Sequence, residues 1–386
     1  SILLNVLNGN QKLHTGQICI NGYDIHRERE AVEGLIGYVP QDDLLIEELT
    51  VYQNLMFNAR LCFASHSEAE LKEVVDRSLV DFDLVEAQEL KVGNPLNKFI
   101  SGGQRKRLNI ALELMREPAV LFVDEPTSGL SSNDSEKVML LLKRQTIKGK
   151  LVMVNIHQPS SDVFKLFDKL LIMDHGGRII FQGNPMDAVV YFRTAAHYLK
   201  AEESECYACG NVNTEQILKI IEARVVNEYG RLTRKRKRSA REWYDIYQKR
   251  VEPTLKKVDC GQQSLLPQNA FKIPDRAKQL IIFVKRNVMA KLADRQYLAI
   301  SMLEAPLLAL VIGFFTRYAA ATSGVTTRYM FGLNDNIPAF LFMSVIAALF
   351  MGLSVSAEEI IKDRRIRERE KFLHLSHFSY INSKVM

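Results

Sequence analysis

Two long apolar stretches in the last third of the chain constrain its fold more than any other feature. Residues 297–315 contain one charged side chain, Glu304, and residues 337–356 contain none. Each stretch is close to the roughly 20 residues that an α-helix needs to cross a bilayer. A segment surrounded by lipid has to satisfy its own backbone hydrogen bonds, and a single segment does so only as a helix. We therefore expect an α-helical transmembrane region with spans at about 297–318 and 337–356.

Basic residues flank both stretches on the sides that lie away from the segment 318–336. Because loops rich in Lys and Arg stay in the cytoplasm, we expect both outer flanks to be cytoplasmic and 318–336 to lie outside. Two buried helices of a soluble protein are the alternative, which these charges disfavour. Residues 279–295 interleave apolar and basic side chains, which also suits an amphipathic helix on the inner leaflet. The flanking basic residues are Lys285, Arg286, Lys291 and Arg295 before the first stretch and Lys362, Arg364, Arg365, Arg367, Arg369 and Lys371 after the second.

Residues 1 to about 195 have the pattern of an α/β domain. Short, continuous apolar runs alternate with segments of helical periodicity, which is typical of a largely parallel sheet covered by helices. A helical insertion interrupts this pattern, and its second helix opens with a capping box formed by Ser67 and Glu70. The expected strands are 16–25, 34–43, 119–123 and 151–156, with a hairpin at 169–183, and the expected helices are 50–62, 67–84, 104–115 and 135–147.

Residues 196–275 are expected to form a connector that is partly helical and basic, before a transmembrane domain that begins at 276 and continues to 386. Its basic stretch, residues 231–250, is most simply a solvated surface. Beside an inner leaflet, each basic residue would add about 1 kcal/mol of attraction to anionic lipid. A patch that binds RNA or DNA is the other interpretation.

The cysteines point to a reducing environment. Five cysteines form a sparse, odd-numbered set, which favours reduced thiols in a cytosolic setting. Cys206 and Cys209 have the spacing of half a zinc site, but no second Cys or His pair completes it. We therefore favour free thiols or a redox-sensitive pair over a structural metal.

Two carboxylates follow the most apolar run of the first domain. Asp124 and Glu125 end the run LFVDEP, residues 121–126. Ligands of parallel sheets bind at the carboxyl ends of the strands, so this placement suits a site. One carboxylate can hold a hydrated Mg²⁺ while the other orients and deprotonates a water molecule. Taken alone, the three residues Asp-Glu-Pro could merely cap a turn.

Three further groups belong with this pair. Gln41 follows a strand, where its neutral amide could contact both Mg²⁺ and an attacking water molecule. His157 follows the run 151–156 and could donate a hydrogen bond to a terminal phosphate oxygen. The segment ISGGQ, residues 100–104, offers backbone amides ahead of a helix, which is an arrangement that binds anions. A lone His at a strand end is more often structural. All these groups together, however, indicate a site that binds phosphate groups and acts on them.

These segments resemble the motifs of a known family. ISGGQRKRLNIALELMREPAVLFVDEPTSGL (100–130) resembles the signature motif and Walker B segment of an ATP-binding cassette (ABC) ATPase. GYVPQDD (37–43) resembles its Q-loop region, and NIHQPSSDVF (155–164) resembles its switch-histidine region. DEPTSGLSS and HQPS, followed by transmembrane spans, are similar to the G subfamily of half-transporters. The resemblance implies a P-loop NTPase-type nucleotide-binding domain with a helical insertion, followed by a partial transmembrane domain of two spans.

The resemblance also implies roles for matched positions. Gln41 would be the Q-loop glutamine, Asp124 the Walker B acid, Glu125 the general base and His157 the switch histidine. The signature, Ser101, Gly102, Gly103 and Gln104, would contact the γ-phosphate of ATP held by a second nucleotide-binding domain. The cofactors would be ATP and Mg²⁺, with Asp124, Gln41 and Ser1 as the side chains nearest the metal.

The sequence departs from the family pattern at three places. Ile100 replaces the usual Leu. Ser131 stands where many members have Asp, so communication across the dimer is expected to use Asp134 or to differ in detail. No G-x-x-x-x-G-K-[ST] segment is present. Residues 1–9 align with the helix after that motif, which would make Ser1 the Mg²⁺-binding hydroxyl. We therefore expect the phosphate loop upstream of Ser1, in a longer protein of which this chain is an excerpt.

The leading hypothesis is an ATP-hydrolysing half-transporter that exports or translocates a substrate, with a lipid or another hydrophobic compound as the candidate class. Its expected partners are a second nucleotide-binding domain, in a homodimer or heterodimer, and membrane lipid. Nucleic acid is not expected as a partner. The protein would be a multi-pass membrane protein with its nucleotide-binding domain in the cytoplasm. A soluble ABC ATPase acting on nucleic acid or ribosomes, and a non-hydrolysing regulatory subunit, are the alternatives.

Overall fold

The computed structural model describes residues 2–94, 97–198, 201–206, 209–255, 263–267, 271–317, 336–370 and 373–385. They form two compact units. The first unit contains Ser1–Asp43 and Gly102–Asn269, and the second contains Leu44–Ser101 and Ala270–Met386. The α/β pattern predicted for the first domain is present in the first unit, and the helical insertion belongs to the second.

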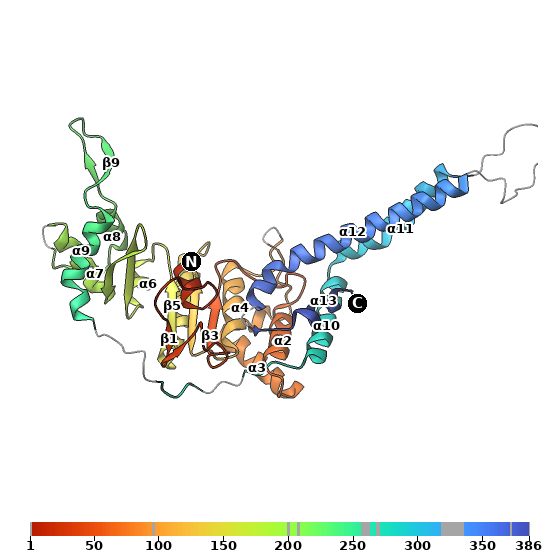
Figure 1. Ribbon diagram of the computed structural model, residues 1–386, viewed down its shortest axis with the longest axis horizontal. Coiled ribbons are helices and arrows are strands. Elements are labelled where there is room, and N and C mark those ends of the chain that lie inside the picture. The colour runs from red at the N-terminus through yellow and green to blue at the C-terminus, as the bar shows by residue number, and fades with distance from the viewer. Residues whose placement is uncertain are drawn as a thin grey trace, which may run out of the picture. The chain divides into compact units, whose positions relative to one another are not determined.

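A three-stranded parallel sheet organises the first unit (Figure 1). Its strands are β3 (Ile36–Val39), β4 (Val120–Asp124) and β5 (Leu151–Asn155), in the order β3-β4-β5. All five residues of β4 are buried, as expected for a central strand that helices cover. Asp124 pairs with Asn155 in the register of β4 and β5, so the carboxyl ends of these two strands lie level.

Helices pack on this sheet. Leu4 of the first helix, α1 (Ile2–Leu7), contacts Val120 and Phe122 of β4. The other helices around the sheet are α4 (Gly102–Leu114), α5 (Ser132–Ile147) and the short α6 (Ser161–Lys165). Serine side chains begin α5 and α6: the hydroxyls of Ser131 and Ser160 each accept a backbone hydrogen bond as N-caps.

The prediction of one strand at 16–25 is wrong. The segment instead forms a small antiparallel hairpin of β1 (Cys19–Ile20) and β2 (Tyr23–Asp24). Asn21 and Gly22 connect them, with φ values of +49° and +86°. An Asn-Gly pair accepts two positive φ angles readily, and this is the turn that two-residue hairpins prefer. The turn chemistry therefore overrides the alternating pattern.

The rest of the first unit contains a hairpin of β6 (Leu170–Asp174) and β7 (Arg178–Gly183), followed by α7 (Pro185–Ala195), α8 (Thr214–Ile221) and α9 (Ala240–Arg250). Phe192 and Trp243 pack edge to face in the core that joins α7 and α9. The segment predicted as a connector therefore supplies core residues of its own. Between α8 and α9, β8 (Arg224–Val226) and β9 (Leu232–Arg236) form an exposed hairpin that projects from the helices (Figure 1). A short 3₁₀ helix, Glu252–Thr254, follows α9.

The second unit is helical. It contains α2 (Val51–Cys62), α3 (Glu68–Asp81), a 3₁₀ turn at Val85–Ala87, α10 (Arg276–Ala293), α11 (Arg295–Phe315), α12 (Asn336–Glu370) and α13 (His377–Val385). Capping boxes begin α2 at Thr50 and α3 at Ser67, the second as the sequence predicts. One face of α10 is buried against α2 and α13, with Phe283 contacting Leu61 and Tyr380. This face therefore packs on protein, whereas the prediction considered a helix lying on lipid.

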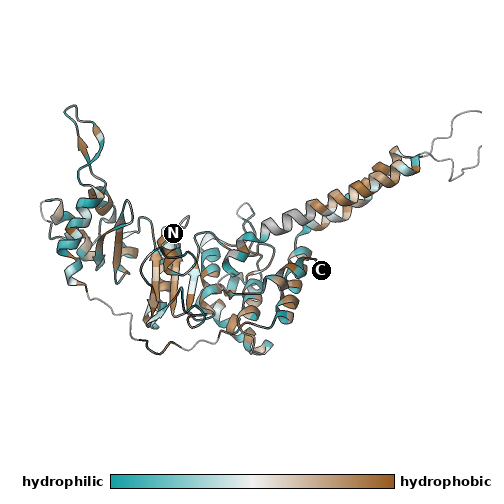
Figure 2. Ribbon diagram, in the orientation of Figure 1, coloured by the Kyte–Doolittle hydropathy of each residue, from teal (hydrophilic) through white to brown (hydrophobic). Residues whose placement is uncertain are grey.

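Two helices of the second unit are long and apolar enough to cross a membrane. They are α11, Arg295–Phe315, and the first part of α12, Asn336–Leu353. The two helices lie side by side, and the residues of their apolar windows are mostly hydrophobic (Figure 2). None of the residues in either apolar window is buried. The core helix of a soluble protein would be mostly buried, so this exposure agrees with the predicted membrane spans. The first helix ends at Phe315, and the segment 318–335 lies outside the described residues.

Candidate active site at the sheet edge

Gln41 and Glu125 meet at the carboxyl end of the sheet. Gln41 follows β3 and Pro40, and its side-chain Nε2 donates a hydrogen bond of 2.8 Å to Oε2 of Glu125. Glu125 is the first residue after β4 and has a φ of +45°, which is rare for a residue with a side chain. Its backbone N–H donates a bond of 2.9 Å to the carbonyl of Asn155, which holds this conformation. The structure thus brings together two residues that the sequence predicted for one site.

Asp124, by contrast, is buried, with 3% of its surface exposed. Its Oδ1 accepts a hydrogen bond of 2.7 Å from the side-chain Nδ2 of Asn155, its partner on β5. A hydrogen bond from an amide donor fixes the direction of the carboxylate oxygens. Asn155 therefore orients Asp124. The sequence analysis did not identify this residue, although Asn155 stands two positions before His157 at a strand end.

His157 lies in the loop between β5 and α6, where its side chain is exposed. Within the residues that the structure describes, its ring makes no hydrogen bond or ion pair. Two hydrogen bonds hold the loop after His157. Thr214 Oγ1 donates one of 2.8 Å to the carbonyl of Pro159, and Ser161 Oγ accepts one of 2.9 Å from the N–H of Val212. The start of α8 thus fixes the loop that carries His157 and leaves the imidazole accessible.

The signature segment lies at the start of α4. The helix begins at Gly102, two residues earlier than predicted. Ser101 precedes it and is exposed, while Gly103 is buried and Gln104 is half-buried. The first backbone N–H groups of a helix have no partner within it and carry a partial positive charge. Ser101 and Gly102 are therefore at a helix terminus that is suited to an anion.

Three consecutive basic residues follow the signature, and all are buried. Lys106 Nζ donates a hydrogen bond of 2.7 Å to the backbone carbonyl of Gln41 and lies 3.2 Å from Oδ1 of Asp43. Arg105 Nε lies 3.6 Å from the other oxygen of Asp43. Arg107 is 3.9 Å from Asp134 on α5. The basic run therefore connects the signature helix to the segment that carries Gln41 and to the helix after Glu125. Sequence reasoning missed these contacts.

Asp124 and Gln41 fit a magnesium ion. Carboxylate and amide oxygens are the donors that Mg²⁺ prefers. The side-chain amide nitrogen of Gln41 bonds to Glu125, and its oxygen accepts no hydrogen bond within the described part of the chain. Asp124 supplies the charge at the same edge. Ser1, the third side chain that the sequence predicted for the metal, lies outside the described residues.

In the described residues, no group of three or more His, Cys, Asp or Glu side chains is arranged to hold an ion. Cys206 and Cys209 are both exposed. The zinc interpretation of this pair gains no support from the neighbouring side chains.

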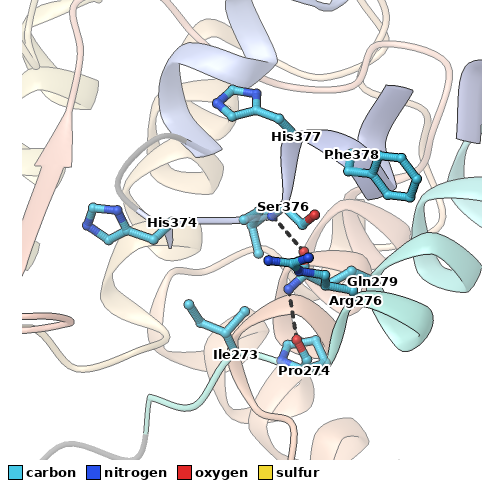
Figure 3. A pocket seen from close by; sticks show the side chains of 9 residues that line it. Ile273, Pro274, Arg276, Gln279, His374, Ser376, His377 and Phe378 are labelled. Carbon is cyan, nitrogen blue, oxygen red and sulfur yellow. Dashed lines mark hydrogen bonds between the residues drawn. The ribbon is translucent and has the colours of Figure 1, made fainter. Parts of the chain in front are cut away.

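The second unit has an open cavity of about 530 Å³ where the start of α10 meets the segment before α13. Arg276, His374 and His377 line it (Figure 3). Gln279 also lines the cavity. Its side-chain Nε2 donates a hydrogen bond of 2.8 Å to the carbonyl of Pro274, and its Oε1 accepts one of 2.8 Å from the N–H of Ser376. None of the predicted site residues lines this cavity. The hydrogen bond between Ser376 and Gln279 connects the segment before α13 to α10.

A buried ion-pair cluster lies in the second unit beyond the second apolar window. Arg286 of α10 and Glu370 of α12 form a hydrogen-bonded pair, and both side chains are at least 94% buried by surface area. Burial opposes the charge of Arg286, but Glu370 outweighs it and the pKa of the guanidinium is raised. Arg369 donates a bond of 2.7 Å to the carbonyl of Leu44, three residues after Gln41.

Parts of the chain are similar to known ABC transporters. Residues 1–128 match the family model described as ABC transporter. Relatives include the "ABC-type transporter claG" of Penicillium crustosum, 36% identical over 51% of this chain and 26% of the relative. "Broad substrate specificity ATP-binding cassette transporter ABCG2" of Bos taurus is 37% identical over 50% of this chain and 29% of the relative. "ABC transporter G family member 28" of Arabidopsis thaliana is 38% identical over 46% of this chain and 16% of the relative.

Among solved structures, cbiO1 from Clostridium perfringens, described as part of the ABC transporter complex cbiONQ, matches with a TM-score of 0.44. It is 28% identical, and the match covers 52% of this chain and 79% of that chain. The matched part of this chain spans less than a third of the length of each of the three relatives above.

Proposed function

Since the chain carries an ABC transporter domain of the G-subfamily type, with the P-loop NTPase fold that its motifs predicted, we propose that it binds and hydrolyses ATP as a subunit of a membrane transporter. The proposal covers the hydrolysis itself, the residues that perform it and its coupling to transport. We propose residues 1–195 as the nucleotide-binding domain, 196–275 as a connector and 276–386 as the start of the transmembrane domain.

One observation carries the proposal: the 2.8 Å hydrogen bond between Gln41 and Glu125 at the carboxyl end of the sheet. A general base has to lie within hydrogen-bond reach of the water that it deprotonates. Glu125 is the group for this role, because it extends from a strand end at a fixed, unusual backbone angle. The side-chain amide of Gln41 lies next to the Glu125 carboxylate. It can orient a water molecule there without taking its proton.

The remaining side chains have matching roles. Asp124, oriented by Asn155, and the amide oxygen of Gln41 would hold Mg²⁺, which would neutralise developing charge on the phosphate oxygens. His157, exposed and held by its loop, would donate a hydrogen bond to the terminal phosphate. Each of these roles uses an atom that faces the carboxyl edge or lies in a loop leaving it.

The position of the signature suits contact with ATP on a second nucleotide-binding domain, from a second copy of this chain or from a related chain. A helix terminus with Ser101 and Gly102 binds an anion, and the family's head-to-tail arrangement would supply it as the γ-phosphate of ATP held by the partner domain. We therefore propose a dimer of nucleotide-binding domains, in which this chain contributes its signature, at the start of α4, to ATP bound by its partner.

Coupling to the membrane would pass through the segment after Gln41. Leu44 accepts a hydrogen bond from Arg369, which follows the second apolar window on the same helix, α12. Arg286 and Glu370 fix α10 to α12 next to this contact. A movement of the segment after Gln41 would thus reach the helices proposed to cross the membrane. We propose export or translocation of a lipid or another hydrophobic compound, and a cytoplasmic nucleotide-binding domain.

Membrane extraction and ATP hydrolysis test this function together. We expect the full-length protein to stay with membranes through high-salt and alkaline washes and to hydrolyse ATP in a Mg²⁺-dependent way after reconstitution. Release by alkaline wash would contradict the transporter. Stable membrane insertion with ATP binding but no hydrolysis would instead favour a regulatory subunit.

A further inference from the structure

The two signature glycines, Gly102 and Gly103, lie close to side chains of the segment that follows Glu125. A methyl group on Gly102 would lie 3.4 Å from Cδ2 of Leu130, which is an ordinary contact. A methyl group on Gly103 would lie 2.6 Å from Oδ1 of Asp134 and 2.7 Å from its Cγ. Gly103 has an ordinary helical backbone, so a side chain at this position would meet no strained φ angle but would force the Asp134 carboxylate to move.

Asp134 is fixed by several contacts at once. It is the third residue of α5, and its backbone N–H donates a bond of 3.2 Å to Oγ of the N-cap Ser131. The Ser131 hydroxyl in turn donates a bond of 2.9 Å to Oδ2 of Asp134. Oδ1 lies against Gly103 and is 3.9 Å from NH1 of the buried Arg107. One carboxylate therefore joins the start of α5 to the first two turns of the signature helix.

The chain between Glu125 and Asp134 is short and turned. Ser128 N–H donates a bond of 3.2 Å to the carbonyl of Glu125, and Leu130 N–H donates one of 3.3 Å to the carbonyl of Thr127. Gly129 has a φ of +72° within this path. Two successive turns thus connect Glu125 to the helix on which Asp134 stands. A shift of α5 relative to the signature helix would be transmitted to Glu125 through few rotatable bonds.

We propose that Asp134 is a positioning residue, which holds the signature helix in register with the loop that carries Glu125. The inference rests on the proposed ATPase function. Asp134 contacts neither ATP nor water in this role. It acts through Gly103 and Arg107. In the proposed dimer, the signature of this chain contacts one ATP and Glu125 acts on the other. Asp134 would keep the position of the signature helix constant relative to Glu125. This also gives Ser131 a function, because it caps α5 and orients the carboxylate.

Asp134→Asn and Asp134→Ser test the role in the reconstituted full-length protein. Both keep the backbone bond to Ser131, but the first removes the charge and the second also removes the contact with Gly103. Because a misplacement of about 1 Å can cost about 100-fold in rate, we expect kcat to fall about tenfold in Asp134→Asn and about 100-fold in Asp134→Ser. The apparent KM for ATP should change less than about threefold, since no group that binds ATP is altered.

Glu136→Gln is the matched control, since Glu136 is an exposed acid two positions further along α5. It should keep the wild-type kcat. If Asp134→Ser also keeps the wild-type kcat, the positioning role is refuted. A wild-type protein without hydrolysis would refute the proposed function instead.

A second measurement separates positioning from simple destabilisation. In a Glu125→Gln background, nucleotide should be trapped between two domains, and adding Asp134→Asn should lower the trapped fraction about tenfold with an unchanged melting temperature. Full trapping in the double variant, or a loss of trapping that tracks a lower melting temperature, would overturn the proposal.

Discussion

The side-chain amide of Gln41 donates a hydrogen bond of 2.8 Å to the carboxylate of Glu125, although the two residues are 84 positions apart in the chain. The parallel pairing of β3 with β4 makes this possible, because it places the residues that follow both strands at one edge of the sheet. The predicted chemistry depends on this edge. The first three variants below alter contacts that support it, and the fourth tests the core of the same unit.

Asn155→Ala should weaken the response to magnesium. The substitution removes the 2.7 Å bond that orients Asp124. Loss of a residue that supports a metal ligand typically costs 10- to 100-fold in metal affinity or activity, so we expect the Mg²⁺ concentration for half-maximal ATP hydrolysis to rise about tenfold. A magnesium titration of the reconstituted protein measures it. The exposed Asn133 on α5, replaced by Ala, is the control, and equal titration curves for both variants would contradict the role of Asn155.

Asp43→Ala should lower the stability of the first unit. Lys106 and Arg105 would remain buried without the carboxylate that faces them. Removing one partner of a buried hydrogen-bonded group costs about 1–3 kcal/mol, and Lys106 keeps its bond to the carbonyl of Gln41. Arg77→Ala breaks an exposed pair with Glu73 and should cost less than about 1 kcal/mol. Thermal unfolding compares the two variants. If they melt at the same temperature, the buried cluster does not stabilise the signature helix.

Gly103→Ala and Gly102→Ala should differ, although the glycines are neighbours. The added methyl group at 103 would overlap Asp134, whereas the one at 102 would make an ordinary contact with Leu130. Overpacking costs about 1–3 kcal/mol, so we expect Gly103→Ala alone to lower the melting temperature clearly. Adding Asp134→Ala should recover most of that loss, because it removes the overlapping carboxylate. Additive effects in the double variant would show that Asp134 is not the reason for the glycine.

Tyr191→Phe should weaken the loss of stability at high pH. Burial raises the pKa of the Tyr191 phenol to about 12, and its hydroxyl is buried with no hydrogen-bond partner in the described residues. The neutral phenol is favoured by folding, so its contribution is complete below about pH 10, where an unfolded tyrosine titrates, and is lost as the pH rises towards about 12.

The Phe variant should match or exceed the wild-type melting temperature at pH 7, since it removes an unpaired polar group. It should lose less stability than the wild type between pH 10 and 12. Tyr229, 86% exposed, is the control position for a Phe replacement. Parallel pH curves for Tyr191→Phe and the wild type would contradict the account of this phenol.

Local patterns predicted much of the fold. The apolar run before Asp124 and Glu125 is a buried strand, and Ser67 begins a helix with a capping box, as its sequence indicates. The Asn-Gly pair that turns the chain at Asn21 was also readable, but the alternating pattern around it favoured one strand over a hairpin. Such signals depend on neighbours in the sequence, which is why they are visible there.

The supporting contacts of the site could not be predicted in the same way. Asn155 orients Asp124 because β4 and β5 pair in one particular register, and no local pattern contains that register. Asp134 reaches Gly103 because the first turns of α4 and α5 lie close together. Arg105, Lys106 and Arg107 are three consecutive basic residues, yet all three are buried because they have partners in other segments. These positions depend on tertiary packing between residues far apart in the chain.

Glu125→Gln in the reconstituted full-length protein tests the central claim most directly. The change keeps the shape of the side chain and removes the base, and a base of this kind contributes about 10²- to 10⁴-fold to the rate. We predict that ATP hydrolysis falls at least about 100-fold while ATP binding is kept and nucleotide becomes trapped in the dimer. Hydrolysis at the wild-type rate in Glu125→Gln would contradict the assignment of Glu125 as the base, and with it the site described at this sheet edge.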